Sequence, residues 1–478
     1  MNILFVSDVA RNFSVGGFEP LGIMYLAAPL KAAGHTVSIC DADEADIRKH
    51  LDEFRPRIIA YSATTGAHEL FLSLNRKVKK RGDIISVFGG PHPTFYPKMI
   101  EEDGVDAICL GEGEDAFAEF VGRLDRGEDI STVLNFHVKT CGTIIRNELR
   151  PLVEDLDRLS FPDRELFYGA YPAARGAKMK TFLASRGCPY RCTYCFNHLY
   201  NKLYRGKGRI VRSRSPGNVI EEVARVKERY PFELVVFHDS SLLFDAQWLK
   251  EFCARFRKEI GLPFNCNATA EHITEDRVAS LKEGGCFSIV WAAEAGNDRI
   301  RNEVLKRSMT KETMLNAGCL LHAHGIHFEI QNIVGIPGES LDECLETLDF
   351  NIRCRPGYAS TSLLYPYPGT EIYDIARSMG LLPEGDIRFE ETFYVHSPLR
   401  LPARREIENL QKLFSVTVEF PLLRNLTRLL VRLPLSPFYN FIRRIHKGFC
   451  LRYRIFYYRI SMREYVSLVW RFLTSKAG

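Results

Sequence analysis

Residues 185–195 read Ser185-Arg-Gly-Cys188-Pro-Tyr-Arg-Cys192-Thr-Tyr-Cys195 and follow a short apolar, strand-like run. Three of the 13 cysteines lie within the last eight residues of this stretch. Three residues separate the first two cysteines, and two residues separate the second from the third. A structural zinc ion takes four protein ligands, and only His198 or a distant cysteine could supply the fourth. Three thiolates suit an iron–sulfur cube that keeps one iron open. The cube is therefore the favoured interpretation, and a zinc site is the alternative.

Strands and helices alternate on the C-terminal side of this motif. Six strand–helix repeats predict a partial parallel barrel of the (β/α)6 type, in which the chemistry lies at the C-terminal ends of the strands. The strand-like runs are 181–184, 234–238, 264–267, 287–292, 328–334 and 360–364, and the helix-like stretches are 216–229, 245–259, 274–283, 298–306, 311–324 and 340–353.

A second alternating series precedes the motif. It predicts a Rossmann-like parallel sheet, whose ligands bind outside the carboxyl ends of the strands. A hairpin turning at Cys141-Gly142 and an irregular linker over 150–180 should follow it. The strand-like runs are 3–7, 36–40, 58–62, 84–88 and 107–110, and the stretches with helical spacing are 21–33, 66–81, 95–102 and 114–126.

Four segments result: a Rossmann-like domain (1–130), a hairpin and linker (131–175), the partial barrel (176–395) and a basic, mostly helical region (396–478). With 478 residues, 46% of them apolar and 26% charged, the chain is neither disordered nor a disulfide scaffold. The odd cysteine number and an N-terminus without a basic signal region predict a reducing, cytoplasmic location. No apolar run approaches the 18 residues of a spanning helix.

The cysteine motif after the first barrel strand resembles that of the radical S-adenosylmethionine superfamily, and Tyr194 before the last cysteine fits this pattern. The resemblance implies a 4Fe–4S cluster held by Cys188, Cys192 and Cys195. It also implies that S-adenosylmethionine chelates the fourth iron and is cleaved by one electron to methionine and a 5′-deoxyadenosyl radical, or serves as a methyl donor. A low-potential flavodoxin or ferredoxin would supply the electron.

Further matches to this superfamily lie at later strand ends. Val236-Phe-His-Asp239 resembles the segment that contacts the amino group of S-adenosylmethionine. Ala293-Glu-Ala-Gly296 resembles a segment whose glutamate carboxylate hydrogen-bonds the ribose of S-adenosylmethionine. Asn332-Ile-Val-Gly-Ile-Pro-Gly-Glu339 resembles a glycine segment beside the adenine. The implied S-adenosylmethionine residues are Tyr194, His238, Asp239, Glu294, Gly335 and, for the methionine carboxylate, Lys306 and Arg307.

The N-terminal motifs, taken in order, are similar to the cobalamin-binding domain fused ahead of many radical enzymes. Many such domains carry Asp-x-His-x-x-Gly after the first strand, whose His ligates cobalt, but the loop here begins Asp8-Val-Ala-Arg11 and holds no His. The resemblance implies cobalamin without a protein His below the cobalt; the alternative is a scaffold that has lost cobalamin. The implied cobalamin residues are Asp8, Ser62, Thr64, Thr65, Gly89, Gly90, His92, Gly111 and Glu112.

The C-terminal region carries the positive charge of the chain. Residues 401–478 hold 15 Lys and Arg against 4 Asp and Glu, whereas the whole chain has a net charge of only +5. Leu422, Leu426, Leu429, Leu430 and Leu433 form an apolar face at helical spacing. Such helices lie on anionic membrane surfaces. A helical cap packed on the barrel is weighed slightly ahead of this interpretation, and nucleic acid is a minor alternative.

The resemblance implies a cobalamin-dependent radical enzyme that methylates an unactivated carbon: the radical abstracts hydrogen, methylcobalamin supplies methyl, and a second S-adenosylmethionine remethylates cobalamin. The alternatives are an oxidative cyclase like the anaerobic magnesium-protoporphyrin IX monomethyl ester cyclase, a ring rearrangement, and a non-catalytic cobalamin or redox sensor. The apolar and basic C-terminal region favours a lipid, isoprenoid or tetrapyrrole as the substrate.

Overall fold

The computed structural model describes residues 1–8, 19–383 and 396–456. The chain divides into two compact units, residues 1–177 with 200–212 and residues 178–199 with 213–478. The predicted loop after Asp8 and the last part of the predicted basic region lie outside the described residues. No described helix has the length and apolar character needed to cross a membrane.

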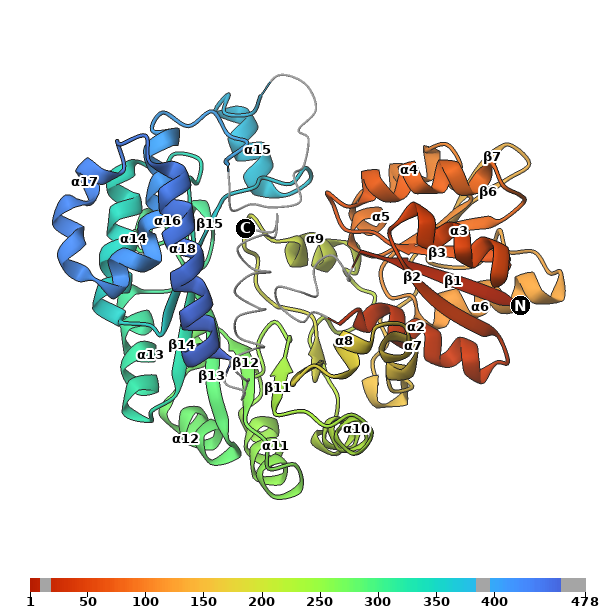
Figure 1. Ribbon diagram of the computed structural model, residues 1–478, viewed down its shortest axis with the longest axis horizontal. Helices are drawn as coiled ribbons and strands as arrows, with labels where there is room; N and C mark the ends of the chain where they lie inside the picture. Colours follow the sequence, from red (N-terminus) through yellow and green to blue (C-terminus); the bar gives the residue numbers. More distant parts are fainter. Residues whose placement is uncertain (9–18, 384–395, 457–478) are drawn as a thin grey trace. The chain divides into compact units, whose positions relative to one another are not determined.

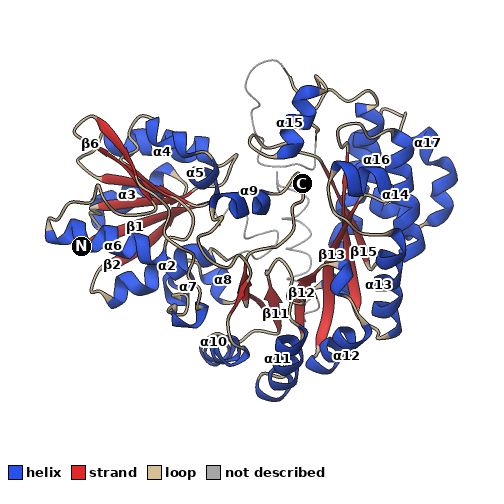
Figure 2. Cartoon of the chain, turned by 180° about the vertical axis from the view of Figure 1, so that it is seen from behind, coloured by secondary structure: helices blue, strands red, loops and turns tan. Residues whose placement is uncertain are grey.

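The first unit contains a seven-stranded sheet in the order β2-β1-β3-β4-β5-β6-β7 (Figure 2). Its first five strands are parallel, as predicted, and β6 and β7 add an antiparallel hairpin. The strands are β1 (Asn2–Ser7), β2 (Thr36–Asp41), β3 (Ile58–Ser62), β4 (Ile85–Gly89), β5 (Ala107–Cys109), β6 (Phe136–Thr140) and β7 (Thr143–Arg146). The helices are α2 (Leu21–Ala32), α3 (Glu44–Glu53), α4 (His68–Lys79), α5 (Pro91–Phe95), α6 (Glu114–Arg126), α7 (Arg164–Ala170) and α8 (Pro172–Arg175), with 3-10 turns η1 (Pro97–Glu101) and η2 (Leu156–Arg158).

Both faces of this sheet are covered, which explains its continuous apolar strands. On one face, Leu4, Ile59 and Phe88 pack with apolar residues of α3 and α4. On the other, Phe5 meets Phe117 of α6 edge to face, with ring centroids 5.8 Å apart. The polar carboxyl ends of the strands are therefore the part of the sheet left for a ligand.

Several local predictions for this unit were wrong. Helix α3 was not predicted, although Asp43 marks its start: the Asp43 carboxylate accepts from the backbone N–H of Ala45 (2.9 Å) and Asp46 (3.2 Å). The predicted helix over 95–102 is instead α5 followed by η1, and the predicted irregular linker contains α7 and α8. The hairpin turn at Cys141-Gly142 is confirmed, with φ of 48° and 78°.

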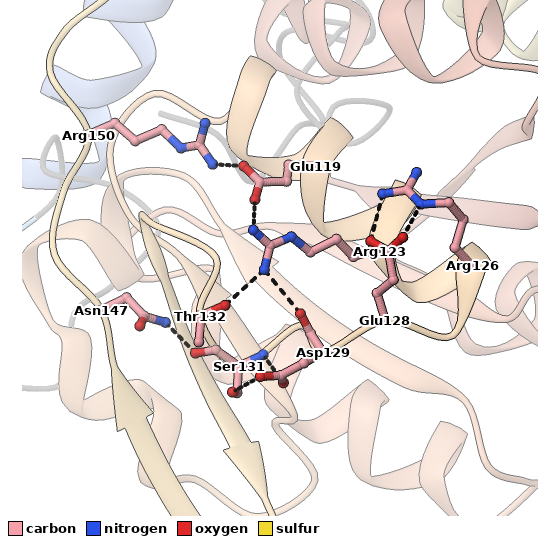
Figure 3. Close-up of polar contacts among 9 residues, drawn as sticks. All are labelled: Glu119, Arg123, Arg126, Glu128, Asp129, Ser131, Thr132, Asn147 and Arg150. Atoms are coloured by element: carbon pink, nitrogen blue, oxygen red, sulfur yellow. Dashed lines mark hydrogen bonds and ion pairs between the residues drawn. The ribbon is translucent and has the colours of Figure 1, made fainter.

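A surface network fixes the end of α6 to the following loop (Figure 3). The Arg123 guanidinium pairs with Glu119 at 2.5 Å and donates to the Asp129 carbonyl (3.1 Å) and the Thr132 hydroxyl (2.8 Å). Arg150 pairs with the other oxygen of Glu119. Two cations thus share one carboxylate, and the loop that leads into the hairpin is held against the helix.

The second unit contains a six-stranded, wholly parallel sheet in the order β15-β14-β13-β12-β11-β8, which is the predicted partial barrel (Figure 1). Its strands are β8 (Met179–Phe182), β11 (Leu234–Phe237), β12 (Phe264–Ala268), β13 (Cys286–Glu294), β14 (His327–Val334) and β15 (Tyr358–Leu363). A separate two-stranded sheet is formed by β9 (Ser185–Arg186) and β10 (Arg212–Ser213). The helices are α9 (Phe196–Leu203), α10 (Pro216–Arg229), α11 (Ala246–Glu259), α12 (Glu275–Gly284), α13 (Lys311–Ala323), α14 (Leu341–Cys354) and α15 (Glu371–Ser378), with a 3-10 turn η3 (Ala270–His272) and a π-helical turn η4 (Ile300–Val304).

The C-terminal region begins as part of the barrel and ends with an apolar surface. Helix α16 (Arg404–Glu419) covers the edge strand β15, and Gln411 donates to the Thr361 carbonyl (2.8 Å). Beyond α16, apolar side chains are exposed, including Leu422 (85%) and Leu429 (62%). The packed cap and the exposed apolar face therefore occupy different segments. The remaining elements are η5 (Pro421–Leu426), α17 (Thr427–Leu430), α18 (Ser436–Cys450) and the π-helical turn η6 (Leu451–Ile455).

Candidate functional site

The loop that carries the three cysteines starts from a braced strand. The buried Asp239 carboxylate, at the end of β11, accepts from the Ala184 backbone N–H (3.0 Å) and the Ser185 hydroxyl (2.5 Å). Burial raises the pKa of Asp239. Asp239 was predicted to contact S-adenosylmethionine, and here it fixes the backbone just before the motif.

Thr193 ties the middle of the motif to two other elements. Its N–H donates to the Leu305 carbonyl (3.2 Å), its hydroxyl to the Val304 carbonyl (2.8 Å), and its carbonyl accepts from Ile372 N–H (3.1 Å). Three bonds from one residue hold this segment against the end of η4 and the start of α15. The sequence contained no specific signal for this anchor.

The three cysteines are close to one another but spaced more widely than ligands of one ion. Two groups of three metal-ligand side chains within the described residues have all ligand atoms within 4.8 Å, and these cysteines form neither group. A tetrahedral zinc ion needs sulfurs about 3.8 Å apart. Cys192 is buried, Cys188 and Cys195 are half-buried, and burial raises the pKa of Cys195 to about 11. The set fits a multi-iron cluster, whose binding would displace the thiol protons.

Arg307 brings a positive charge to this set of thiols. Its Nη1 lies 3.6 Å from Cys192 Sγ, and its Nη2 donates to the Ala292 carbonyl (2.9 Å). Its Nε is buried with no hydrogen-bond partner. Neighbouring Lys306 instead pairs with Glu371 on a more exposed side. Of the two predicted carboxylate-binding residues, the structure therefore brings only Arg307 to a cysteine of the motif.

A second polar pair lies beside the motif. The Tyr194 hydroxyl donates to Glu294 Oε1 at 2.6 Å, and Glu294 is only 7% exposed. Burial raises the pKa of Glu294, while Arg307 and the Tyr194 hydrogen bond lower it. Glu294 has φ = 62° and follows a register shift after Ala292, so β13 bends where this carboxylate is presented.

The loop after β14 is organised around its glycine and a buried carboxylate. Gly335 has φ = 77°, and Glu339 Oε2 accepts from the N–H of Gly335 (2.8 Å) and Ile336 (3.0 Å). Burial raises the pKa of Glu339 to about 7. Glu339 belongs to the glycine segment noted in the sequence, but no role was predicted for it.

His238, which was predicted to bind S-adenosylmethionine, is half-buried at the end of β11.

The candidate cobalamin residues gather at the carboxyl ends of β3, β4 and β5. The strand order β2-β1-β3-β4-β5 reverses direction between β1 and β3, where such sheets bind ligands. The Thr65 hydroxyl lies 3.1 Å from His92 Nδ1, and His68 stacks on the His92 ring with centroids 3.7 Å apart. Burial lowers the pKa of His92 to about 3. His68 was missed, since nothing in the sequence sets it apart. Ser62 is half-buried, Thr64 exposed, and Asp8 half-buried after β1.

The three glycines predicted to bind cobalamin differ in how strongly the fold depends on the absence of a side chain there. Gly90 (φ = 95°) would place a Cβ 3.0 Å from the Ala63 carbonyl oxygen, and Gly111 (φ = 67°) would place one against Tyr204. Gly89 has no positive φ, and the nearest atom to an added Cβ is Cys109 Cβ at 3.9 Å. The fold itself needs Gly90 and Gly111, whereas at Gly89 an added Cβ would make only an ordinary van der Waals contact with Cys109.

Glu112, the last predicted cobalamin residue, is engaged by the protein. Its carboxylate pairs with the buried Arg212 guanidinium (2.9 and 3.0 Å) and accepts from the Val153 backbone N–H (3.0 Å). These contacts hold the loop after β5 in place. The Glu112 side chain points to Arg212, so any contact of this residue with cobalamin would come from its backbone.

Comparison with known proteins agrees with both halves of this arrangement. Residues 11–121 match the family model of the B12 binding domain, and residues 182–350 match that of the radical S-adenosylmethionine superfamily. An uncharacterized methyltransferase of Pyrococcus horikoshii is 28% identical over 80% of this chain and 84% of its own length. The anaerobic magnesium-protoporphyrin IX monomethyl ester cyclase of Rubrivivax gelatinosus is 26% identical over 78% of this chain and 69% of its own length.

Solved structures share the fold. The radical S-adenosylmethionine methyltransferase TsrM from Kitasatospora setae, with tryptophan and a S-adenosylmethionine analogue bound, superposes with a TM-score of 0.67 at 17% identity, covering 84% of this chain and 80% of TsrM. The cobalamin-dependent radical enzyme OxsB gives 0.63 at 21% identity, covering 79% of this chain and 55% of OxsB.

The fold, the cysteine motif and the matches define an enzyme that couples a B12-binding domain to a radical S-adenosylmethionine barrel. The chain carries a B12-binding domain over residues 11–121 and a radical S-adenosylmethionine domain over residues 182–350. The predictions of fold class, of an enzyme, and of a 4Fe–4S cluster, S-adenosylmethionine and cobalamin as cofactors are thereby confirmed.

Proposed function

We propose that this enzyme methylates an unactivated carbon of a small molecule. When bound, the cluster with S-adenosylmethionine supplies a radical that abstracts hydrogen, and cobalamin supplies a transferable methyl group. The observation that carries the proposal is the set of polar residues Tyr194, Glu294 and Arg307 beside the cysteine motif, in a chain that also has a B12-binding domain. The match to a methyltransferase over 84% of that relative's length supports methylation.

Residues of the second unit have distinct roles in this proposal. Cys188, Cys192 and Cys195 hold the cluster, and the Arg307 guanidinium stabilises its negative charge through Cys192 Sγ. Glu294, held by Tyr194, accepts from ribose hydroxyls. Asp239 is a positioning residue, because its carboxylate is saturated by the backbone and side chain of the motif's own strand.

The carboxyl ends of β3, β4 and β5 bind the cobalamin nucleotide tail. Gly89 lets the tail approach the backbone, and Ser62, Thr64 and Thr65 offer hydroxyls to it. His92 is neutral and engaged with Thr65 and His68, which is consistent with a hydrogen-bonding rather than a cobalt-ligating role.

The test uses anaerobically reconstituted protein with hydroxocobalamin, S-adenosylmethionine and a low-potential reductant. Retained corrin absorption together with 5′-deoxyadenosine and S-adenosylhomocysteine supports methylation. Deoxyadenosine without retained corrin contradicts the cobalamin part of the proposal. A product mass that gains one methylene separates methylation from the cyclase alternative, which inserts oxygen and removes hydrogen.

We also propose that residues 420–453 dock on anionic membranes and that the substrate is an apolar molecule such as a tetrapyrrole or isoprenoid lipid. On α18 and η6 the exposed apolar side chains repeat at three- and four-residue steps, which places them on one helix face. Residues 401–478 supply the positive charge that anionic lipids attract. Relatives named for magnesium-protoporphyrin and hopanoid substrates support the substrate class. The exposed apolar residues of the whole segment are Phe420, Leu422, Leu426, Leu429, Leu435, Phe438, Phe441, Ile445, Phe449 and Tyr453.

Liposome sedimentation tests this surface. The full-length protein should bind vesicles of mixed phosphatidylcholine and phosphatidylglycerol, and the Phe441→Ser, Ile445→Ser double variant should lose most of that binding. A matched Leu134→Ser change removes an exposed apolar side chain in the first unit and should have no effect. Equal binding of all three proteins, or none by the wild type, contradicts the proposal.

A further inference from the structure

A cluster of three metal-ligand side chains lies in the C-terminal region, apart in sequence from the cysteine motif. Glu419 ends α16, and His446 and Cys450 lie one turn apart on α18. Cys450 Sγ is 3.4 Å from His446 Nε2, and His446 Nε2 is 3.6 Å from Glu419 Oε2. All three ligand atoms lie within 4.8 Å of one another, and Cys450 is fully buried.

These separations match a tetrahedral zinc site. Zn–N and Zn–O distances of about 2.0–2.1 Å and a Zn–S distance of about 2.3 Å place nitrogen and sulfur ligands about 3.5 Å apart, and nitrogen and oxygen ligands about 3.4 Å apart. One imidazole, one thiolate and one carboxylate are ligands that zinc accepts. The three atoms can therefore bind one ion with little movement.

The surrounding contacts orient the ligands as in metal sites. His446 Nδ1 lies 3.2 Å from the Ser415 hydroxyl, one turn before Glu419, which leaves Nε2 facing the cluster. Arg454 holds both oxygens of Glu419 (2.7 and 3.0 Å) and keeps that carboxylate in place. Arg454 also adds positive charge, which the thiolate formed on metal binding offsets.

The second cluster with suitable spacing differs in this respect. In the group of Cys40, Asp46 and His50, the Asp46 carboxylate already accepts from the Asp41 N–H (2.9 Å), and His50 Nδ1 lies 2.9 Å from the Asp46 carbonyl oxygen. The carboxylate of each group already has protein partners, so the difference lies in the histidine: His50 Nδ1 faces a carbonyl oxygen of its own helix, whereas His446 Nε2 faces the other two ligands. This difference favours the cluster on α16 and α18 as a binding site.

We propose that Glu419, His446 and Cys450 bind one zinc ion that links α16 to α18. The fourth coordination position of the ion would be open to water. Binding displaces the Cys450 thiol proton and replaces the S–H contact to His446 with two metal bonds. The ion would fix α18, which carries the exposed apolar face, against the helix that covers the barrel edge. The site is independent of the cluster motif and of the proposed methylation.

The experiment is a cobalt titration of the full-length protein in which Cys188, Cys192 and Cys195 are changed to Ser, so that the motif cannot take up the metal. We expect one equivalent of Co²⁺ to give a thiolate-to-cobalt charge-transfer band with tetrahedral d–d bands, and Zn²⁺ to abolish both. His446→Gln and Cys450→Ser should each remove the charge-transfer band. The matched changes Cys319→Ser, at an exposed position, and His324→Gln, at a half-buried imidazole that pairs with Glu275, should leave it intact.

A thermal measurement covers the case in which a variant fails to fold. Zinc should raise the melting temperature of the triple-Ser protein, whereas Mg²⁺ at the same concentration should not. Metal analysis of the reconstituted wild type should find one zinc beyond the iron of the cluster. Absence of the charge-transfer band, or a band and melting shift unchanged by Cys450→Ser, overturns this site and leaves the proposed methylation untouched.

Discussion

The Tyr194 hydroxyl donates a 2.6 Å hydrogen bond to Oε1 of Glu294, joining the cysteine loop to the end of β13. Glu294 is buried and Tyr194 is half-buried, so the carboxylate depends on this bond more than a solvent-exposed group would. The Arg307 guanidinium contacts the Cys192 sulfur, and its positive charge lowers the pKa of Glu294. The proposed cluster ligands and the proposed nucleoside-binding carboxylate are thus one connected polar group.

Replacing Glu294 should weaken S-adenosylmethionine binding without unfolding the barrel. In Glu294→Gln the amide oxygen still accepts from Tyr194, but the charge that strengthens bonds to ribose hydroxyls is lost. We expect affinity to fall by about tenfold to a hundredfold, as for the loss of a charge-assisted hydrogen bond. Equilibrium dialysis measures it, with Glu312→Gln on the exposed face of α13 as control. Unchanged affinity would show that Glu294 has only a structural role.

Cys192→Ala should abolish the cluster. One of three thiolates is lost, so the reconstituted variant should retain little iron or sulfide and form no 5′-deoxyadenosine. Cys141→Ala, at the exposed hairpin turn, should keep the wild-type iron content. Iron and sulfide analysis gives the answer, and full iron loading of Cys192→Ala would refute the ligand assignment.

Removing the charge of Arg307 should make the cluster harder to reduce. Reduction adds negative charge, which the guanidinium beside Cys192 Sγ stabilises, so Arg307→Gln should lower the potential by tens of millivolts with iron content preserved. Lys306→Gln removes a neighbouring charge that pairs with Glu371 instead, and should change it less. Redox titration followed by electron paramagnetic resonance compares the two; equal potentials would contradict this role.

Two glycines of the first unit should respond in opposite ways. Gly89→Ala meets no close atom, so the cofactor-free protein should keep its stability within about 0.5 kcal/mol while losing cobalamin. Gly111→Ala combines a positive φ with a clash against Tyr204, and should cost about 2 kcal/mol or more even without cobalamin. Chemical denaturation and corrin retention separate the two effects. Cobalamin binding by Gly89→Ala at the wild-type level would argue against the proposed tail site.

His92 should make the first unit sensitive to acid. Burial lowers its native pKa to about 3, so between about pH 3 and pH 6.5 the unfolded chain binds one proton more than the native chain. This contribution is complete above pH 6.5, and stability falls below it by about 1.4 kcal/mol per pH unit. Denaturant unfolding at pH 7 and pH 5 should show a smaller loss for His92→Gln than for the wild type. Equal losses would mean that His92 is not buried as a neutral ring.

The sequence by itself determined the order of the elements and the chemistry of the motif. Apolar strands between amphipathic stretches fix two parallel sheets, because strands buried on both faces cannot alternate with polar residues. Three cysteines within eight residues predict a shared ligand, because they are local neighbours on one loop. The short helix α3 and the turns of the linker were missed, because caps and single turns leave a weaker signal than a long amphipathic period.

Only the tertiary structure decided which residues meet across the chain. Tyr194 and Glu294 are 100 residues apart, and Glu419 and Cys450 come from two helices, so no local pattern could pair them. Whether Gly111 can carry a side chain depends on Tyr204, which is 93 positions away in the sequence. The residue types that carry the chemistry are set by local sequence, whereas their burial, partners and free space arise from contacts that form only when distant segments pack together.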